Sequence, residues 1–454
     1  MIAELSEALR HKEATCASLT RTALERIEEE QPRLNAFITV MADSAQARAV
    51  ELDRELAAGR DRGPLHGIPV ALKDLVHVRG VRTTGGSLVY KDYVAAETAE
   101  VARRLEEAGA VIVGKAGLHE LAYGITSNNP HFGAIRNPRD VSRIPGGSSG
   151  GSGAAVAAGI VPMAIGTDTG GSIRIPASFC GCVGLKPTYG RVSKRGVLPL
   201  GYSLDHIGPL AATVDDAAIT LDAIAGHDPH DPTTTRRPVE AYRPGAVTSL
   251  RGFRVGRPNQ YYFDRLAPAV AARIARAFEV AAGLGAAIVP LELPDVEEWN
   301  ATSRTILLAE ASAALEPHLH RRDLFSVEAL ALFDQGRLLP ATMYVQAQRA
   351  RTMMLGALRG VWRQVDCFFT PATPTTAPLI GATTIEVGGA REDVRLVSTR
   401  FARAINLLGL PALALPCGTD AAGLPVGLQI VAPAFGERNL LRVGAALEVA
   451  VARG

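Results

Sequence analysis

The sequence predicts an α/β protein in which strands and helices alternate in layers. Two segments with strand-like alternation, HGIPVALKDLVHV (66–78) and VIVGK (111–115), flank the helical segment AETAEVARRLEEAGA (96–110). The alternation continues beyond HDPHDPTTTRRPVEAYRPG (227–245), a polar, proline-containing stretch that is the best linker candidate. With 454 residues, 47% of them hydrophobic, the chain can bury a large core. We therefore expect one layered α/β domain over residues 1–454.

The elements before the linker follow from changes in periodicity. Residues 1–60 are expected to be helical, because Leu5, Leu9 and Ile27 belong to a series at roughly helical spacing. A long loop rich in Gly, Pro and Asn follows at 124–153, and loops of that length usually serve a function. AAVAAGIVPMAIGTD (154–168) is typical of a buried helix that runs into a short strand.

The elements after the linker are assigned in the same way. Two segments of strand character surround the helix APAVAARIARAFEVAAGLG (267–285), and a mostly helical region follows. Two buried strands that enter proline turns complete the chain. The ranges are 252–258 and 286–294 for the flanking strands, 297–365 for the helical region, and 365–378 and 410–418 for the buried strands.

Composition excludes several classes of partner. The 48 basic and 46 acidic residues give a net charge of +2, so nothing indicates binding to nucleic acid or to an acidic membrane surface. Aromatic residues make up only 5%, too few for base-stacking platforms. No run approaches the roughly 18 apolar residues of a membrane span. We expect neither nucleic acid nor a membrane as partner.

The cysteines indicate a reducing compartment. Five cysteines are scattered along the chain, and the single close pair, in FCGC, has no second pair to complete a zinc set. His119 and Glu120 are adjacent but lack a spaced third ligand, so we expect no metal site. The N-terminal segment MIAELSEALRHKEATC lacks the apolar core of a signal peptide. We predict a cytoplasmic protein.

The loop PGGSSGGSGAAVAAG (145–159) has several possible uses. A phosphate-binding loop needs G-x-x-x-x-G-K-[ST], and no lysine follows its glycines. Gly146–Gly150 does match the G-x-S-x-G nucleophile elbow. That motif requires a preceding strand and a later Asp and His, but the approach NPRDVSRIP is a poor strand and no histidine follows His320. The sequence therefore favours neither a phosphate-binding loop nor a nucleophile elbow.

A second Gly-Ser loop, GTDTGGSIRIPASFCG (166–181), suggests a different chemistry. Gly170, Gly171 and Ser172 would expose consecutive backbone N–H groups that can hold an anion beside a hydroxyl nucleophile. A neutral lysine could serve as the base, because burial lowers the pKa of lysine from about 10.4. Lys73 fits, since it ends an apolar strand. The alternative is a structural ion pair between Lys73 and a carboxylate such as the adjacent Asp74.

Taken together, these segments resemble the amidase signature enzymes. PGGSSGGSGAAVAAG followed by GTDTGGSIRIPASFCGCVGLKPTYGRVS is similar to the family signature, and HGIPVALKD is similar to its lysine motif. The similarity extends through SLDHIGPLA (203–211) and LPALALPCG…GLPVGLQIVAP (410–432). The resemblance implies a single three-layer α/β/α domain around a large mixed, mostly parallel twisted sheet. Its core signature would span about 66–211, and a substrate-shaping helical region about 297–365.

The resemblance also assigns the catalytic residues. The family uses a Ser–cis-Ser–Lys triad, in which the nucleophile matches Ser172, the bridging serine Ser148 and the base Lys73. The peptide bond from Gly147 to Ser148 is then expected to be cis. Lys73 would take a proton from Ser148, which would take one from Ser172 as it attacks the carbonyl.

Further site residues follow from the same match. The N–H groups of Thr169, Gly170, Gly171 and Ser172 would form the oxyanion hole. Asp168 and Arg174 would pair and, with Gly147, support the site. The resemblance places a substrate pocket at four further residues: Tyr123, Ile125, Thr126 and Ile175.

The expected function is hydrolysis of the C–N bond of linear amides without a cofactor. Apolar side chains in 300–350 favour aryl or alkyl amides, with carbamates (a urethanase-like activity) or esters as extensions. One alternative is the glutaminase component of a tRNA-dependent amidotransferase, although relatives of that kind usually have SIRQP where this chain has Ile175. Another is a urea- or biuret-type hydrolase. As partners we expect a small amide or carbamate substrate and a monomer or homodimer, with activity that rises toward alkaline pH.

Overall fold

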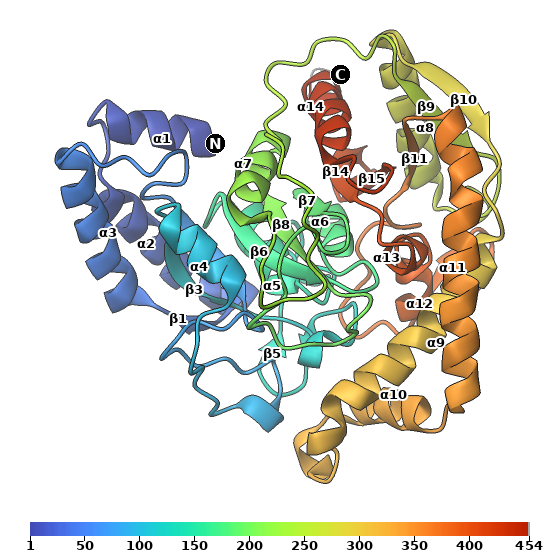
Figure 1. Cartoon of the computed structure of the whole chain (residues 1–454), viewed down its shortest axis with the longest axis horizontal. Helices are drawn as coiled ribbons and strands as arrows, with labels where there is room; N and C mark the ends of the chain where they lie inside the picture. Colours follow the sequence, from blue (N-terminus) through green and yellow to red (C-terminus); the bar gives the residue numbers. More distant parts are fainter. Residues whose placement is uncertain (453–454) are drawn as a thin grey trace.

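A mixed sheet of eleven strands forms the centre of the protein within residues 1–452, the part of the chain that the computed structural model describes (Figure 1). Its strand order is β1-β3-β2-β6-β8-β7-β14-β15-β11-β9-β10. The strands of this sheet are β1 (Phe37–Val40), β2 (Pro69–Lys73), β3 (Val111–Ala116), β6 (Met163–Asp168), β7 (Val183–Lys186), β8 (His206–Ala211), β9 (Arg254–Pro258), β10 (Ala287–Leu291), β11 (Cys367–Pro371), β14 (Ala412–Thr419) and β15 (Pro425–Val431). Two small antiparallel pairs lie outside it, formed by β4 (Asn128–Asn129) with β5 (Gly133–Ala134) and by β12 (Thr384–Val387) with β13 (Ala390–Asp393).

Helices cover both faces of the sheet. The helices are α1 (Ile2–Arg10), α2 (Cys16–Leu34), α3 (Ala42–Ala57), α4 (Glu100–Glu107), α5 (Gly150–Ala157), α6 (Arg174–Cys180), α7 (Val214–Ile224), α8 (Pro268–Gly283), α9 (Val296–Leu315), α10 (Val327–Arg337), α11 (Ala341–Gln364), α12 (Val394–Thr399), α13 (Arg403–Leu407) and α14 (Glu437–Ala452). Helix α14 contacts both α7 and α8 beside the sheet, whereas α5 and α6 pack together against its central strands. Helices α9, α10 and α11 form a separate layer, which α13 joins to the rest (Figure 1).

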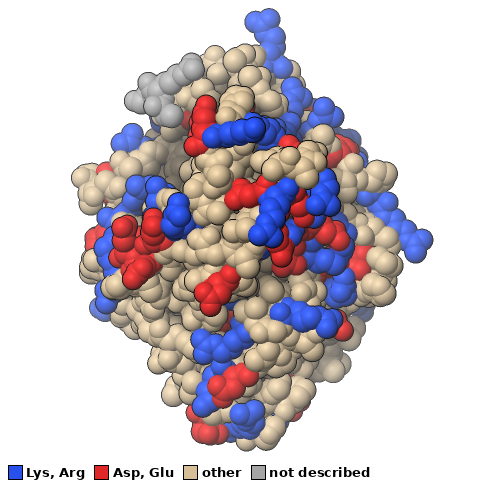
Figure 2. All heavy atoms as spheres, turned by 90° about the vertical axis from the view of Figure 1, so that its left-hand side faces the viewer, with Lys and Arg blue, Asp and Glu red and all other residues tan. Residues whose placement is uncertain are grey.

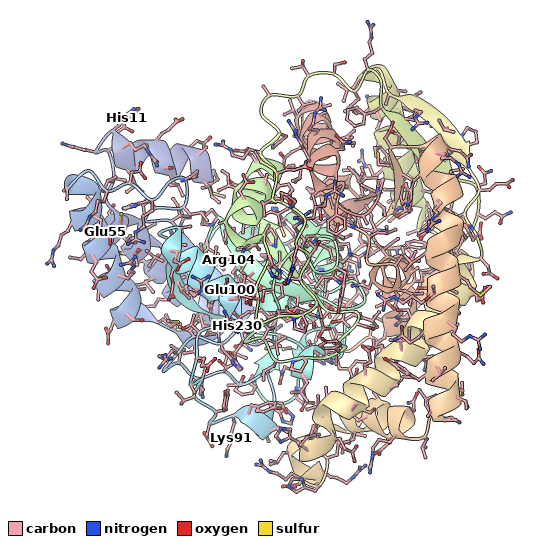
Figure 3. All side chains as sticks on the ribbon, in the orientation of Figure 1. His11, Glu55, Lys91, Glu100, Arg104 and His230 are labelled. Atoms are coloured by element: carbon pink, nitrogen blue, oxygen red, sulfur yellow. The ribbon has the colours of Figure 1, made fainter. Side chains whose placement is uncertain are left out.

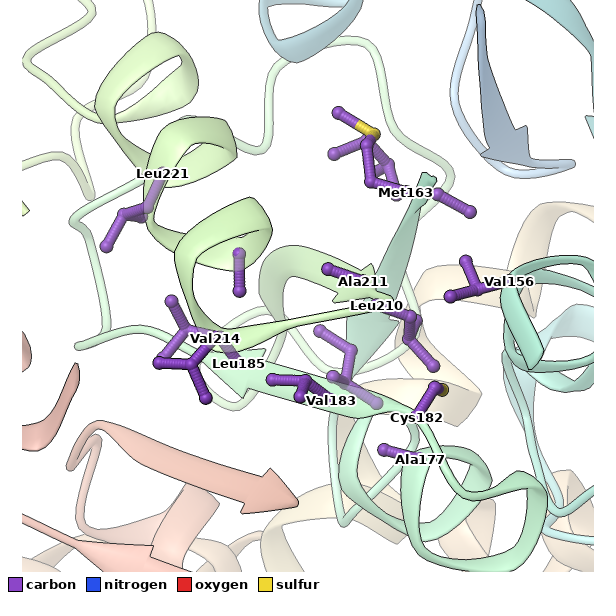
Figure 4. Close-up of a cluster of buried hydrophobic side chains, with 14 of the residues drawn as sticks. Val156, Met163, Ala177, Cys182, Val183, Leu185, Leu210, Ala211, Val214 and Leu221 are labelled. Atoms are coloured by element: carbon purple, nitrogen blue, oxygen red, sulfur yellow. The ribbon is translucent and has the colours of Figure 1, made fainter. Parts of the chain in front are cut away.

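The central strands lie in an apolar core between α7 and α6. Figure 4 shows Met163 and Leu210 from neighbouring strands, with Leu221 of α7 to their left and Ala177 of α6 below. All four side chains are fully buried. Because interiors are packed to the density of organic crystals, this contact fixes β6, whose last residue is Asp168.

Most strands and helices that the sequence predicts are present, with one correction near the start. The expected helical region 1–60 contains α1, α2 and α3 but is interrupted by strand β1. This strand pairs antiparallel with β3, Phe37 lying opposite Ala116. Strand β1 has only four residues, and its partner β3 lies far along the chain. The sequence around β1 is therefore too short to show the alternation that would predict a strand.

The expected large mixed sheet is confirmed, but parallel pairing is not dominant. Among residues 1–452, four of the ten neighbouring strand pairs are parallel and six are antiparallel. The parallel pairs lie toward the two ends of the sheet, at β3-β2-β6 and β11-β9-β10. In the middle, short connections such as the one between β14 and β15 join antiparallel neighbours, because parallel ones require longer crossovers.

The predicted linker 227–245 has no helix or strand, yet it is anchored to the protein. Arg104 of α4 donates to the carbonyl of His227 at 2.9 Å and also forms a 2.7 Å ion pair with Glu100 on its own helix (Figure 3). Strands from both sides of this segment share the eleven-stranded sheet. This continuity supports the single domain over 1–454, which we keep as a proposal.

The surface carries both charge signs. On the face drawn in Figure 2, basic and acidic side chains are interspersed, in agreement with the net charge of +2. Among the helices of residues 1–452, none combines the length and the apolar character that crossing a bilayer would require.

Candidate active site

Lys73 occupies a buried position at the end of β2. This strand lies between β3 and β6, parallel to both, and all of its residues are buried. The Nζ atom of Lys73 donates to Ser148 Oγ at 2.8 Å and to Thr167 Oγ1 at 2.7 Å. Burial lowers the pKa of Lys73 to about 7, although Asp205 and Asp168 oppose the shift. The alternative ion pair with Asp74 does not form, because Asp74 pairs with Lys115 at 3.0 Å.

Ser148 is presented to Lys73 by the turn before α5. The Gly147–Ser148 peptide bond is cis, which confirms the prediction. The Ser148 carbonyl accepts a 3.1 Å hydrogen bond from the N–H of His119, and the side chain is fully buried. The N–H of Ser149 donates to the carbonyl of Ser172 at 3.3 Å, so the two Gly-Ser loops are joined directly.

Ser172 lies in the turn between β6 and α6 and lines a cavity. The preceding Gly171 has φ +124°, and a Cβ there would lie 2.8 Å from that of Ala402, so this turn requires glycine. Within residues 1–452 the Ser172 hydroxyl has no hydrogen-bond partner. The side chains of Ser148 and Ser172 therefore form no hydrogen bond with each other in this structure. Catalytic hydrogen bonds often shorten only when substrate binds.

Asp168 and Arg174 clamp the Ser172 turn, as the sequence predicts. Asp168 accepts hydrogen bonds from the N–H groups of Gly171 at 2.7 Å and Ile173 at 3.1 Å. Arg174 donates to both oxygens of Asp168, at 2.9 and 3.0 Å, and both side chains are fully buried. Burial alone would raise the pKa of Asp168, but the Arg174 guanidinium holds it well below its usual range.

The clamp changes the set of N–H groups that can hold an anion. The Gly171 N–H, expected in the oxyanion hole, donates to Asp168 instead. In the described part of the chain, the N–H groups of Thr169, Gly170 and Ser172 donate to no protein acceptor. Three of the four predicted donors are therefore available to a ligand.

Two of the four predicted pocket residues line the cavity. Tyr123 and Ile125 lie in its wall together with Gly170 and Ser172. Thr126 is not among the lining residues and approaches His119 Nδ1 at 3.3 Å. Ile175 also lies elsewhere, because α6 turns its side chain into a fully buried apolar cluster.

The cavity wall is more polar than the sequence predicts. Leu307 and Leu308 of α9 supply the expected apolar surface, but the same wall contains Arg304, Arg395 and Arg403, with Asp393 as the one acidic neighbour and Gln335. The sequence predicts none of these five polar residues. It also does not predict Thr167, which accepts a hydrogen bond from Lys73. The arginines come from three different helices, so no short sequence motif predicts that they lie together.

Comparison with known proteins agrees with this geometry. The family model described as Amidase matches residues 18–441. The chain is 40% identical to a subunit of glutamyl-tRNA(Gln) amidotransferase from Geobacter metallireducens, over 99% of this chain and 97% of that one. The structure of the same subunit from Thermotoga maritima has a TM-score of 0.82 at 34% identity and covers 95% of this chain and 91% of that one. A structure described as a vestigial protein complex that reveals the origins of an s-triazine catabolic enzyme reaches a TM-score of 0.95 at 36% identity, with coverage of 98% and 97%.

Both the family model and these relatives extend over nearly the whole chain. The segments that carry the resemblance are also the ones that the fold brings together around Lys73, Ser148 and Ser172. The chain therefore belongs to the amidase signature family of enzymes, which act on carbon–nitrogen bonds.

Proposed function

We propose that this protein hydrolyses a small carboxamide through an acyl-enzyme on Ser172, with Lys73 as base and Ser148 as proton relay. The observation that carries the proposal is the 2.8 Å contact between Lys73 Nζ and Ser148 Oγ at a fully buried position. Because the pKa of Lys73 is lowered to about 7, a substantial fraction of the lysine is neutral near neutral pH. Ser172 lies on the neighbouring loop and lines the cavity.

The chemistry balances without a cofactor. Neutral Lys73 takes the proton of Ser148, Ser148 takes the proton of Ser172, and Ser172 Oγ bonds to the amide carbon. The C–N bond then breaks, and the proton returns through Ser148 to the departing nitrogen. Water attacks the resulting ester by the same relay, which releases the carboxylic acid and restores the Ser172 hydroxyl.

Two sets of neighbours support this reaction. The Thr167 hydroxyl accepts a hydrogen bond from Lys73 and so orients the amine toward Ser148. The free N–H groups of Thr169, Gly170 and Ser172 would stabilise the oxyanion. In other enzymes, loss of one such donor costs about 3–4 kcal/mol.

For the substrate, we favour a polar primary amide such as glutamine over the apolar aryl amides that the sequence analysis places first. Several relatives with 38–40% identity over nearly the whole chain are named as subunits of glutamyl-tRNA(Gln) amidotransferase. The presence of Ile175 where such relatives usually have Gln is a weaker argument against a glutaminase than expected, because the Ile175 side chain lies outside the cavity. The arginines in the wall also suit a polar ligand better than an aryl group. Carbamates and esters gain no support from these relatives.

The same comparisons support protein partners in place of a monomer or homodimer. The amidotransferase relatives are named as subunits, and the s-triazine structure is described as a complex. The s-triazine structure, with its TM-score of 0.95, is described in connection with the breakdown of a nitrogen-rich ring, and we keep a urea- or biuret-type amide as a second candidate substrate. The cysteines at 16, 180, 182, 367 and 417 are all unpaired and buried, which supports the proposed cytoplasmic location.

The test is ammonia release from glutamine and from biuret, measured with the chain alone and with co-expressed amidotransferase partner proteins. Ser172→Ala is the control. Glutamine turnover that needs the partners and disappears in the variant supports the amidotransferase role, whereas biuret turnover favours the second candidate. An anilide is assayed in parallel by aniline release, and its rapid cleavage by the chain alone would restore the apolar-substrate hypothesis. Turnover that is unchanged in Ser172→Ala would refute the mechanism.

A further inference from the structure

The cavity beside Ser172 carries an excess of positive charge. Its charged lining residues are Arg304 of α9, Arg395 of α12, Arg403 of α13 and the single acid Asp393. Helix α13 packs against α9, and α12 lies next to α13 (Figure 1). Three arginines against one aspartate leave a formal excess of two positive charges in the wall.

Two of the three arginines are not neutralised by the protein. Arg395 forms a 2.9 Å ion pair with Glu328. Within residues 1–452, neither Arg403 nor Arg304 pairs with a carboxylate, and neither guanidinium donates a hydrogen bond to the protein. Within the same residues, Asp393 forms an ion pair with neither of these arginines, and its carboxylate accepts the backbone N–H groups of Arg395 and Leu396.

Among the three arginines, Arg403 is the one whose surroundings most favour binding of an anion. A Cβ placed on Gly170 would lie 3.5 Å from Arg403 Cγ, so this side chain runs beside the oxyanion turn. Burial, and next the charge of Arg304, lowers the pKa of Arg403 to about 10. The Arg403 side chain is partly buried, and a bound anion would offset the cost of withdrawing its charge from water. The planar guanidinium matches a carboxylate with two parallel hydrogen bonds.

We propose that Arg403, together with Arg304, binds a carboxylate of the substrate, so that the substrate is an acid with a terminal carboxamide. This rests on the proposed function, because a primary amide releases ammonia and the carboxylate must then belong to the acyl part. The cavity holds about 240 Å³, below the roughly 300–1,000 Å³ of pockets for drug-sized ligands. The substrate class is thus a short amide acid rather than a long-chain or aryl amide.

The first test measures binding without catalysis. Calorimetry on Ser172→Ala protein compares glutaramate, which carries a carboxylate, with its neutral methyl ester. We expect glutaramate to bind at least tenfold more tightly. Adding Arg403→Met should remove that preference, Arg403→Lys should restore part of it, and Arg276→Met, at an exposed pair on α8, should leave it unchanged. Equal binding of acid and ester by the parent protein would overturn the proposal.

The second test separates this proposal from the function on which it rests. Wild-type kcat/KM for the two compounds needs no arginine variant, so it decides the matter even where Arg403→Met fails to fold. Turnover of both at equal efficiency would refute the carboxylate site and leave the hydrolase intact. No turnover of either, combined with Arg403-dependent binding in the first test, would refute the proposed function and keep the site.

Discussion

The sharpest prediction concerns the pH dependence of turnover. The proposed mechanism needs neutral Lys73, whose pKa is lowered to about 7 by burial. Below that value the neutral fraction falls about tenfold with each pH unit. We therefore expect kcat/KM to rise about 50-fold from pH 5 to pH 7 and to level off above pH 8.

A single substitution tests the electrostatic cause. The carboxylate of Asp205 raises the pKa of Lys73 against the larger effect of burial. In Asp205→Asn the charge is lost, while the remaining oxygen can still accept the hydrogen bond from Thr169 Oγ1, 2.6 Å long in the native protein. We expect the midpoint of the pH profile to move to lower pH, because the ammonium form loses a favourable partner.

The assay is ammonia release from glutamine, the proposed substrate, at constant ionic strength from pH 5 to 9. Ser172→Ala supplies the background rate, and circular dichroism at pH 5 shows that the loss of activity is not unfolding. A profile that is flat or falls between pH 5 and pH 8 would refute Lys73 as a neutral base. A midpoint that stays in place or moves to higher pH in Asp205→Asn would refute the assigned role of that charge.

Two further predictions concern the loops around the nucleophile. Ser148→Ala should lower kcat by about 10²–10⁴-fold, because general acid–base relays contribute that much. The matched change Ser152→Ala removes a 3.0 Å hydrogen bond to the Ile165 carbonyl and should leave kcat within about threefold, so equal effects would contradict the relay. Arg174→Met should cost about 3–5 kcal/mol in urea unfolding, because Asp168 becomes an unpaired buried charge. Arg243→Met, at an exposed pair, should cost no more than about 1 kcal/mol, and a similar loss in both variants would argue against the buried clamp.

The sequence predicts the chemistry of the two Gly-Ser loops because that chemistry is local. The glycine before Ser172 has a positive φ, and the pairing of Asp168 with Arg174 spans only six residues. The same holds for Lys73, whose burial follows from the apolar strand that it ends. Turn chemistry and strand burial depend on neighbouring residues, so the printed sequence contains the information.

The surroundings of these residues are not local. The cavity wall joins Ser172 to Arg304 and Arg403, which lie more than a hundred positions further along the chain, and Ile175 leaves the cavity because of how α6 packs. The antiparallel middle of the sheet likewise depends on which distant strands meet.

For this protein, the sequence alone therefore determined the family and, through it, the expected nucleophile, relay and base. Only the tertiary structure decided which N–H groups stay free and which charges line the cavity beside Ser172. The physical reason is that backbone conformation and strand burial are set within a few residues, whereas the composition of a cavity is set by packing between elements that the sequence separates.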